Sequence, residues 1–597
     1  MDCFERAFGK FIRKNTRSLR FPKSFKFSRI LSRRLSLCCG APSFEKYDRI
    51  IGREIDQVNE VKGEEAERRF LNGEDVLPHC DLTVWLRDCK KDIIEPIDGE
   101  PMGTIPHWLR GNFLRNGPGV LSVGQDEFNH LFDSSAVIHR FSIEKGKVTY
   151  QCKFLKSETY RKNVEAQRIV VDEFGTKATP DPCKTIFQKF SAIFSDEMSD
   201  NCMISLYPFR DQIFAMGETP VMYEVDPNNI DTVGRVNMRE YVNIIHNSSH
   251  PHVEEDGTVY LLGLSVDVTG PKYSIVKFPN TRQGTTKPDV FSEAQIVAKV
   301  RTRWPLHQGY MHSFGLTPNY YILIEQPLSV SVPAKLASKI NNKPMSSMLK
   351  WYPDHPTIIY VVSRRNDKIV LKYEAEPFFY LHVINQYEEE GHIIIDVCAY
   401  KDPKMIHCML IESLKGAHEN PKYANLFRSR PARFVLPLRS EKTTGDLVTL
   451  GGTEAKAFFT TRGLIRVLPE ILCEMGCETP RINYPRFLGK KYRYFYSISA
   501  DVDLENPGTL IKVDTYTKTY KTWSEPNTFP CEPIFVPSPG GKAEDDGVIL
   551  TSVLWGSDER KVALVILDAK SFTEIARTEF RAPTPVPKCL HGCFISA

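Results

Sequence analysis

Four histidines occupy similar settings at widely spaced positions, each close to the end of an expected strand or to a turn. They are His250, His312, His382 and His591. Imidazole is a common transition-metal ligand, so we interpret them as four ligands of one metal ion. The intervals between them are 62, 70 and 209 residues, unlike the short spacings of zinc fingers or zinc proteases. Only a closed fold could bring such distant side chains together.

Most of the 15 histidines are expected to be surface or core residues rather than ligands. His246 and His252 lie near His250, and His252 could point to the same face of an extended segment. The histidines that we interpret as structural are His130, His139 and His307.

From Asp81 onward the chain is a succession of short strands separated by turn residues, typical of an all-β sandwich, barrel or propeller. The expected strands are Val148–Phe154, Arg168–Phe174, Gln212–Ala215, Val221–Val225, Thr258–Leu262, Tyr320–Glu325, Thr357–Val362, Ile369–Tyr373, Ile393–Ala399, Tyr492–Ser497, Leu510–Val513, Ile534–Val536, Val548–Val553 and Val562–Leu567.

A weak internal repeat favours the propeller. Tyr223–Thr232, Ile511–Thr519 and Val565–Thr573 each contain a strand that ends in Asp, a short turn, and a Thr that opens the return strand. The Asp can accept backbone N–H groups within the turn. Recurrence of one hairpin type indicates radial repetition of four-stranded blades, whose inner strand ends meet on one axis. This arrangement supplies the closure that the four histidines need.

Charge and composition exclude some classes of protein. Residues 1–40 carry a net charge of +9, which leaves −5 on the rest of the chain, so the body does not suit a nucleic-acid binder. The 15 cysteines are scattered and no signal-peptide core is present, which predicts a reduced, intracellular protein. No run approaches about 18 apolar residues, so no membrane span is expected.

Residues 1–45 are expected to be a basic extension and residues 46–597 one folded domain. The extension suits a mitochondrial transit peptide, and it equally suits a basic arm on an anionic membrane, acylated at Cys38 or Cys39. A disordered tail without an address is the third reading. The expected location is therefore the cytoplasm with peripheral membrane association, with the mitochondrion as the alternative.

The sequence resembles the carotenoid cleavage oxygenases from about residue 47 to the C-terminus. Besides the four histidine segments, the motifs that carry the resemblance are Leu114–Gly119, His130–Asp133, Pro180–Lys184, His312–Thr317 and Glu544–Ile549. One departure is Ser134, where many relatives have Gly after the Phe-Asp pair. The chain is most similar to the insect carotenoid isomerooxygenases within this family, in Glu325–Ser331, Cys477–Ile482, Tyr492–Tyr496, Asn506–Asp514 and Pro585–Gly592.

The resemblance implies a seven-bladed β-propeller with Fe(II) on its axis and a cap of helices and loops that houses an apolar tunnel. The implied iron ligands are His250, His312, His382 and His591. Four ligands leave two of six octahedral positions open for O₂ or water. The second nitrogen of each ring needs a fixed acceptor, and the matching positions offer Glu218 for His312, Glu478 for His382 and Glu532 for His591. His250 has no such carboxylate.

A membrane contact is also implied, because Pro180–Lys184, including Cys183, resembles the membrane-proximal signature of the family. After it, an amphipathic helix is expected within Pro182–Phe194, with an apolar face that includes Phe187, Phe190 and Phe194. This face either lies on a membrane interface or packs into the core.

The predicted activity is Fe(II)-dependent cleavage of the central 15,15′ double bond of β-carotene or zeaxanthin by O₂. The subgroup resemblance implies that one retinal-type product also becomes 11-cis, for visual chromophore synthesis. The alternatives are eccentric 9′,10′ cleavage of xanthophylls, an O₂-independent retinyl ester isomerohydrolase, and a propeller that binds carotenoid without turnover.

Overall fold

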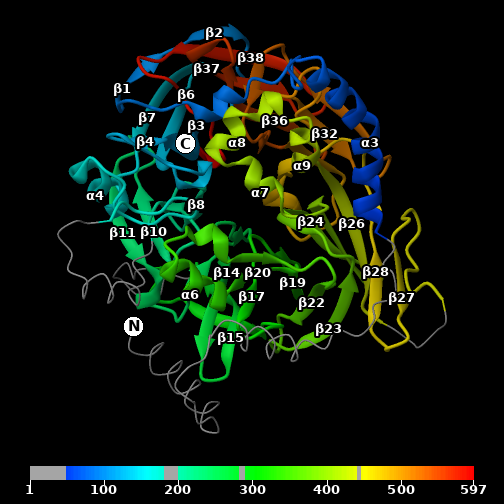
Figure 1. The fold of residues 1–597 in the computed structure, drawn as a ribbon. Coiled ribbons are helices and arrows are strands. Elements are labelled where there is room, and N and C mark those ends of the chain that lie inside the picture. The colour runs from blue at the N-terminus through cyan, green and yellow to red at the C-terminus, as the bar shows by residue number, and fades with distance from the viewer. Residues whose placement is uncertain (1–48, 181–198, 281–289, 440–444) are drawn as a thin grey trace, which may run out of the picture.

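A computed structural model of the protein describes residues 49–180, 199–280, 290–439 and 445–597. Within these residues, seven sheets of four to six strands stand as blades around a ring (Figure 1). The predicted all-β, seven-bladed propeller is therefore confirmed. We number the blades 1 to 7 along the chain, beginning with the sheet that starts at Ser205 and ending with the one that contains the last strand.

Blades 1 to 3 follow one another along the chain. Blade 1 comprises β8 (Ser205–Phe209), β9 (Gln212–Met216), β10 (Val221–Val225) and β11 (Thr232–Asn237). Blade 2 comprises β12 (His246–Asn247), β13 (His252–Val253), β14 (Val259–Asp267), β15 (Gly270–Phe278) and β16 (Gln295–Arg301). Blade 3 comprises β18 (Gly315–Leu316), β19 (Tyr320–Glu325), β22 (Thr357–Ser363), β23 (Ile369–Ala375), β27 (Lys456–Phe459) and β28 (Ile465–Leu468).

Blades 4 to 6 continue the ring. Blade 4 comprises β24 (Phe379–Glu389), β25 (His392–Tyr400), β26 (Ser429–Pro437) and β29 (Glu470–Ile471). Blade 5 comprises β30 (Glu478–Arg481), β31 (Tyr494–Ile498), β32 (Leu510–Asp514) and β33 (Thr519–Trp523). Blade 6 comprises β34 (Thr528–Pro530), β35 (Ile534–Pro537), β36 (Gly547–Trp555), β37 (Asp558–Asp568), β38 (Thr573–Arg581) and the early strand β2 (Glu100–Gly103).

Blade 7 closes the ring by combining the two ends of the propeller domain. Its strands are β1 (Ile93–Asp98), β7 (Lys147–Phe154), β6 (Ser135–Glu144), β3 (Gly111–Val120) and the last strand, β39 (His591–Ser596). β39 pairs with β3, so that Asn116 lies opposite His591. In Figure 1 the blue β2 likewise lies beside the red β38, which joins the ends a second time.

The repeated hairpin of the sequence recurs in three blades with the same geometry. The Asp side chains accept backbone N–H groups inside their turns, from Asn228 to Asp226, from Tyr516 to Asp514 and from Ser571 to Asp568. Four residues after each Asp the backbone is left-handed, with φ of 55° at Ile230, 56° at Lys518 and 63° at Phe572. The expectation of one recurring turn type is confirmed.

Apolar side chains between neighbouring blades form the core. Tyr260 and Leu262 of blade 2, for example, pack in one cluster with Leu323 and Tyr360 of blade 3. Alternate residues of each strand reach opposite faces, so every blade contributes to two such layers. This packing fixes the inner strands around the axis.

A long helix, α3 (Ile50–Leu71), lies along the rim beside blades 4 and 5 (Figure 1). Glu376 accepts the backbone N–H of Ile51 at 2.9 Å, which satisfies a donor at the start of the helix. Arg428 donates to Asn59 at 2.8 Å, and Lys401 pairs with Asp56 at 2.6 Å. Polar contacts therefore hold this helix as much as its few buried apolar residues do.

Short helices, 3₁₀ turns and loops connect the strands. The α-helices are α4 (Glu158–Ala166), α6 (Val332–Ile340), α7 (Met405–Cys408), α8 (Ile411–Lys415), α9 (Tyr423–Phe427) and α10 (Tyr484–Phe487). The 3₁₀ turns are η1 (Leu82–Leu86), η2 (Leu131–Asp133), η3 (Met238–Glu240), η4 (Met345–Met348) and η5 (Ala417–Glu419). Two small sheets complete the elements of the described residues, β4 (Ser122–Val123) with β5 (Asp126–Glu127), and β17 (His307–Gly309) with β20 (Leu328–Ser331) and β21 (Leu349–Trp351).

One predicted strand is wrong. Residues Arg168–Phe174 have no strand pairing, and side chains take up two of their backbone donors instead. Asp126 accepts the N–H of Ile169 at 3.0 Å, and Asn163 accepts that of Val170 at 2.9 Å. The predicted helix within Pro182–Phe194 lies outside the described residues. The 11 cysteines of the described segments are free thiols, and no described helix is long and apolar enough to cross a membrane.

Candidate metal centre

The four predicted histidines come from four blades, or the loops beside them, and gather at the axis. His250 lies between β12 and β13, His312 between β17 and β18, His382 in β24, and His591 at the start of β39. Ring nitrogens of His250, His382 and His591 all lie within 4.8 Å of one another. The Nε2 atoms of His250 and His312 are 2.9 Å apart. The structure thus brings together residues that are up to 341 positions apart in the sequence.

Three of the four rings are held by the carboxylates that the family resemblance implies for them. His312 Nδ1 is 2.6 Å from Glu218, His382 Nδ1 is 2.5 Å from Glu478, and His591 Nδ1 is 2.8 Å from Glu532. Each carboxylate accepts a hydrogen bond from the N–H at Nδ1 of its ring. This bond fixes the tautomer and leaves the lone pair on Nε2.

This arrangement fits a metal ion. The lone pair of His382 Nε2 points into a buried space and has no hydrogen-bond partner. His312 Nε2, whose lone pair is left free by the bond from Nδ1 to Glu218, lies 2.9 Å from His250 Nε2, so one metal ion can bind both rings when His250 carries its proton on Nδ1. A spacing of about 3 Å is also that of adjacent nitrogens bound about 2.1 Å from one ion. The site therefore has what a metal centre needs: imidazole nitrogen donors, a suitable spacing between them, and lone pairs that are free to bind an ion.

His250 is held differently from the other three. Among the described residues, no carboxylate bonds its ring, which packs edge-on against Tyr207, His382 and His591 and at a tilt against His312. Its backbone N–H donates to Ser248 Oγ at 3.3 Å. Burial, reinforced by the neighbouring histidines, lowers the pKa of His250 well below its ordinary value. The ring is therefore kept neutral, as a metal ligand must be.

Two tyrosines stand behind two of the carboxylates, and no sequence pattern identified them. Tyr310 donates its hydroxyl to Glu218 at 2.6 Å, and Tyr400 donates to Glu478 at 2.9 Å. Tyr310 lies two residues before His312, so its position in the histidine segment was a signal that could have found it. Tyr400 gave no such signal, since it comes from the strand beside that of His382.

Two arginines stand behind the third carboxylate and were also missed. Arg481 Nε donates to Glu532 Oε1 at 2.7 Å, and Arg115 Nη1 donates to Oε2 at 2.8 Å. Burial acts to raise the pKa of Glu532, but the charges of Arg481 and Arg115 and the hydrogen bond from His591 hold it well below its ordinary value. Burial lowers the pKa of His591 to about 4. Both arginines lie in motifs that carry the family resemblance.

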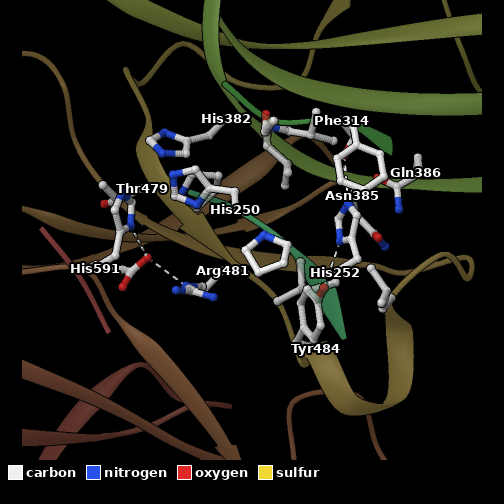
Figure 2. Close-up of a pocket in the computed structure, with 18 of the residues that line it drawn as sticks. His250, His252, Phe314, His382, Asn385, Gln386, Thr479, Arg481, Tyr484 and His591 are labelled. Atoms are coloured by element: carbon white, nitrogen blue, oxygen red, sulfur yellow. Dashed lines mark hydrogen bonds and ion pairs between the residues drawn. The ribbon is translucent and has the colours of Figure 1, made fainter. Parts of the chain in front are cut away.

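A cavity of about 60 Å³ adjoins the four-histidine cluster, lined among others by His250, His382, His591 and Arg481 (Figure 2). His252 also lines this cavity, but both of its ring nitrogens are engaged, with Tyr484 Oη at 2.8 Å and the Phe314 carbonyl at 2.8 Å. The structure thereby separates His252 from the cluster.

The remaining histidines singled out in the sequence lie in other contacts. His246 Nε2 is 3.8 Å from Glu218, and His130 Nε2 is 2.9 Å from the carbonyl of Ile406. His139 and His307 bond tyrosine hydroxyls. The proposed membrane-contact residues Cys183, Phe187, Phe190 and Phe194 lie outside the described residues.

A β-propeller whose axis carries four histidines backed by three carboxylates belongs to the class of metal-binding propeller enzymes. The family model described as retinal pigment epithelial membrane protein matches residues 86–596. The chain belongs to this family, which includes carotenoid oxygenases similar to it along most of its length.

Two insect carotenoid isomerooxygenases are among these similar proteins. The protein of Galleria mellonella is 50% identical over 530 residues, covering 88% of this chain and 98% of the relative. That of Drosophila melanogaster is 45% identical over 598 residues, covering 89% and 95%. A β,β-carotene 15,15′-dioxygenase of Mus musculus is 38% identical over 518 residues, covering 85% and 90%.

Solved structures share the fold. A variant of the apocarotenoid oxygenase of Synechocystis superposes with a TM-score of 0.69 at 22% identity, over 87% of this chain and 100% of that one. The cobalt-substituted form of that enzyme superposes with a TM-score of 0.68 at 22% identity, over 86% and 99%. The similarity thus covers most of the chain.

Proposed function

We propose that this protein is an iron(II)-dependent carotenoid isomerooxygenase. It cleaves the central 15,15′ double bond of a C40 carotenoid such as β-carotene or zeaxanthin with O₂. One retinal-type aldehyde leaves as the all-trans isomer and the other as 11-cis, the form that serves visual chromophore synthesis. The chain's identity of 45–50% to two insect isomerooxygenases supports this reaction.

The observation that carries the proposal is the gathering of four buried histidine rings: ring nitrogens of His250, His382 and His591 lie within 4.8 Å of one another, and His312 Nε2 lies 2.9 Å from His250 Nε2. His250, His312, His382 and His591 are the proposed iron ligands, because neutral imidazole suits Fe(II) and soft thiolates are not among the donors. Bound iron would supply a centre at which O₂ and the polyene can exchange electrons.

The protein's own part is to orient the donors and to exclude water. Glu218, Glu478 and Glu532 keep the proton of each ring on Nδ1 and fix the ring plane. Burial of the rings lowers the local dielectric constant, which strengthens every interaction of the carboxylates with them. These residues are therefore positioning residues, which act on the reaction through the histidines.

Cleavage and isomerisation are proposed to share one centre. Within the described segments, the only group of three or more potential metal ligands contains His250, His382 and His591. Rotation about the 11,12 double bond requires a transient loss of its double-bond character. Attack by O₂ at the conjugated 15,15′ bond would provide that loss by delocalisation along the polyene. A shaped apolar pocket then decides which half rotates.

The test is a reaction in darkness with zeaxanthin and iron-loaded protein, in which the aldehydes are separated by isomer. We expect 11-cis and all-trans products in equal amounts, with O₂ consumed. All-trans retinal supplied alone should give no 11-cis product. Two all-trans aldehydes would leave cleavage without isomerisation, and conversion of added retinal would make isomerisation a separate activity.

The same experiment distinguishes the other candidate activities. Eccentric cleavage at 9′,10′ would give an ionone-type fragment and a longer apocarotenal in place of two retinal-type aldehydes. A retinyl ester isomerohydrolase would form product without O₂ uptake. Carotenoid binding without O₂ uptake or product would reduce the protein to a binding propeller.

We further propose that the protein lies at a membrane surface through the segment 182–194, and that it acts in the cytoplasm. The apolar residues Phe187, Phe190 and Phe194 recur at helical spacing beside Cys183 and two lysines. Changing the three phenylalanines to Ser should release a folded protein from liposomes. Retained binding by the folded variant would exclude the contact, and unfolding would show that the residues belong to the core.

A further inference from the structure

The three carboxylates that hold the histidines differ in what stands behind them. Neutral tyrosine hydroxyls bond Glu218 and Glu478, whereas two guanidinium groups bond Glu532. The electrostatic environment of the centre is therefore uneven. Only the His591 side has its carboxylate paired with positive charge.

Of the two arginines that bond Glu532, Arg481 is connected more closely to the histidine cluster than Arg115 is. Its Nε bonds Glu532 Oε1, the same oxygen that accepts His591 Nδ1 at 2.8 Å. Figure 2 shows the dashed lines that join His591 to Arg481 through this carboxylate. Arg481 Nη2 also donates to the carbonyl of Gly592 at 3.1 Å. Arg481 thus touches the peptide next to His591 as well as the carboxylate that orients it.

Arg481 also faces the cavity beside the cluster, together with His250, His382 and His591. The guanidinium is positively charged at all relevant pH values. Inside a protein the effective dielectric constant is about 20 or lower, so such a charge acts on a nearby ion much more strongly than in water. It therefore disfavours any increase of positive charge at the centre.

We propose that Arg481 is a positioning residue that stabilises the bound iron in its +2 state relative to its +3 state. The inference rests on the proposed iron site and deepens it. In this oxidation, one electron leaves Fe(II) and passes to the mediator of a redox titration, without a change in the ligands. Net charge near an iron centre is one of the factors that set such a potential.

A purely structural role makes a different prediction. Arg481 ends β30 in blade 5 and bonds Gly592 in blade 7, so it could simply tie two parts of the ring together. In that case, removal of its charge with the hydrogen bonds preserved should leave the potential unchanged. Loss of the hydrogen bonds should lower the thermal stability instead.

The test compares two substitutions in full-length, iron-loaded protein. Arg481→Gln removes the charge but keeps an amide N–H donor for Glu532 near the position of Nε, while Arg481→Lys keeps the charge. Tyr310→Phe is the matched control, because it removes a hydrogen bond to Glu218 and no charge. The iron content and the melting temperature of each protein are measured first, followed by the Fe(III)/Fe(II) midpoint potential.

We expect Arg481→Gln to load iron and to lower the midpoint potential. The ferric-to-ferrous ratio at a fixed potential should rise by on the order of tenfold, which is about 59 mV for one electron. Arg481→Lys and Tyr310→Phe should remain within about threefold of the unsubstituted protein.

Equal potentials in Arg481→Gln and Arg481→Lys would overturn the inference. So would an Arg481→Gln protein that folds without iron or does not fold, because the residue would then act through structure. If the unsubstituted protein binds no iron, the proposed function itself fails, and the metal analysis made first shows this before any potential is measured.

Discussion

His250 is held by a different kind of contact from the other three histidines of the metal centre. His312, His382 and His591 are oriented by charge-assisted hydrogen bonds to buried carboxylates. His250 is oriented by packing against aromatic rings and by a short loop between two strands. The first arrangement fixes both the ring plane and the tautomer, whereas packing fixes only the plane.

The comparison teaches where the centre is sensitive to substitution. A carboxylate-held ring depends on one partner, which a single change can remove. A packed ring depends on many weak contacts, each of which contributes little. We therefore expect the effects of substitution to fall steeply from the histidines themselves to their carboxylates, to the tyrosines, and finally to the loop around His250.

The largest effect is expected from His382→Ala. It removes one donor and leaves Glu478 buried without its imidazole partner, so bound metal and turnover should both fall to background. Metal analysis and O₂ uptake measure the two losses. His252→Gln is the control, since it alters the same cavity and should retain metal. Full metal content in His382→Ala would contradict the ligand assignment.

Glu478→Gln should have the next largest effect. The amide keeps the shape of the side chain but removes the negative charge of the carboxylate, which lies 2.5 Å from His382 Nδ1. Losses of about 10–100-fold in metal affinity or activity are typical of such changes. Competition with a chelator measures the affinity. An affinity equal to that of the unsubstituted protein would show that the charge is not needed.

Tyr400→Phe should have a smaller effect. It removes one hydrogen bond to Glu478 and leaves the carboxylate bonded to His382 and to the N–H of Thr479. A single hydrogen bond contributes about 0.5–1.5 kcal/mol, so metal affinity should fall by about twofold to tenfold. The same competition assay applies. A loss as large as that of Glu478→Gln would mean that the tyrosine, and not the histidine, orients the carboxylate.

Ser248→Ala should have the smallest effect, and it tests the packed side directly. The hydroxyl of Ser248 accepts the N–H of His250 at 3.3 Å, a long hydrogen bond, so metal affinity should change by less than about threefold. A tenfold or greater loss of metal affinity would show that His250 depends on a single hydrogen bond, as the carboxylate-held histidines do.

The sequence predicted the recurring parts of the molecule best. The hairpins that begin at Asp226, Asp514 and Asp568 could be predicted because the turn needs an Asp at one position to accept a backbone N–H, and the same turn recurs. The histidine and glutamate pairs could not have been paired by spacing, because contacts across the ring follow no local period. The family resemblance supplied them.

The parts that the sequence did not predict depend on tertiary contacts. Helix α3 has few apolar residues and buries mainly Ile51 and Ile55, and its periodicity gave no signal of where it lies. Its position comes from polar partners such as Arg428 and Lys401, more than 300 residues away. Arg481 and Tyr400 were missed for the same reason, since their roles exist only where strands from different parts of the chain meet.

The position of β39 has a consequence for the synthesis of the protein. This last strand supplies His591 and pairs with β3, which is made almost 500 residues earlier. Much of blades 1 to 5 can form from local hairpins while the ribosome is still at work, but the ring cannot close until the final strand emerges. A chain that terminates before residue 591 lacks both the closing strand and one candidate ligand. Metal occupancy would therefore report that translation has reached this strand, and truncated products would lack a complete centre.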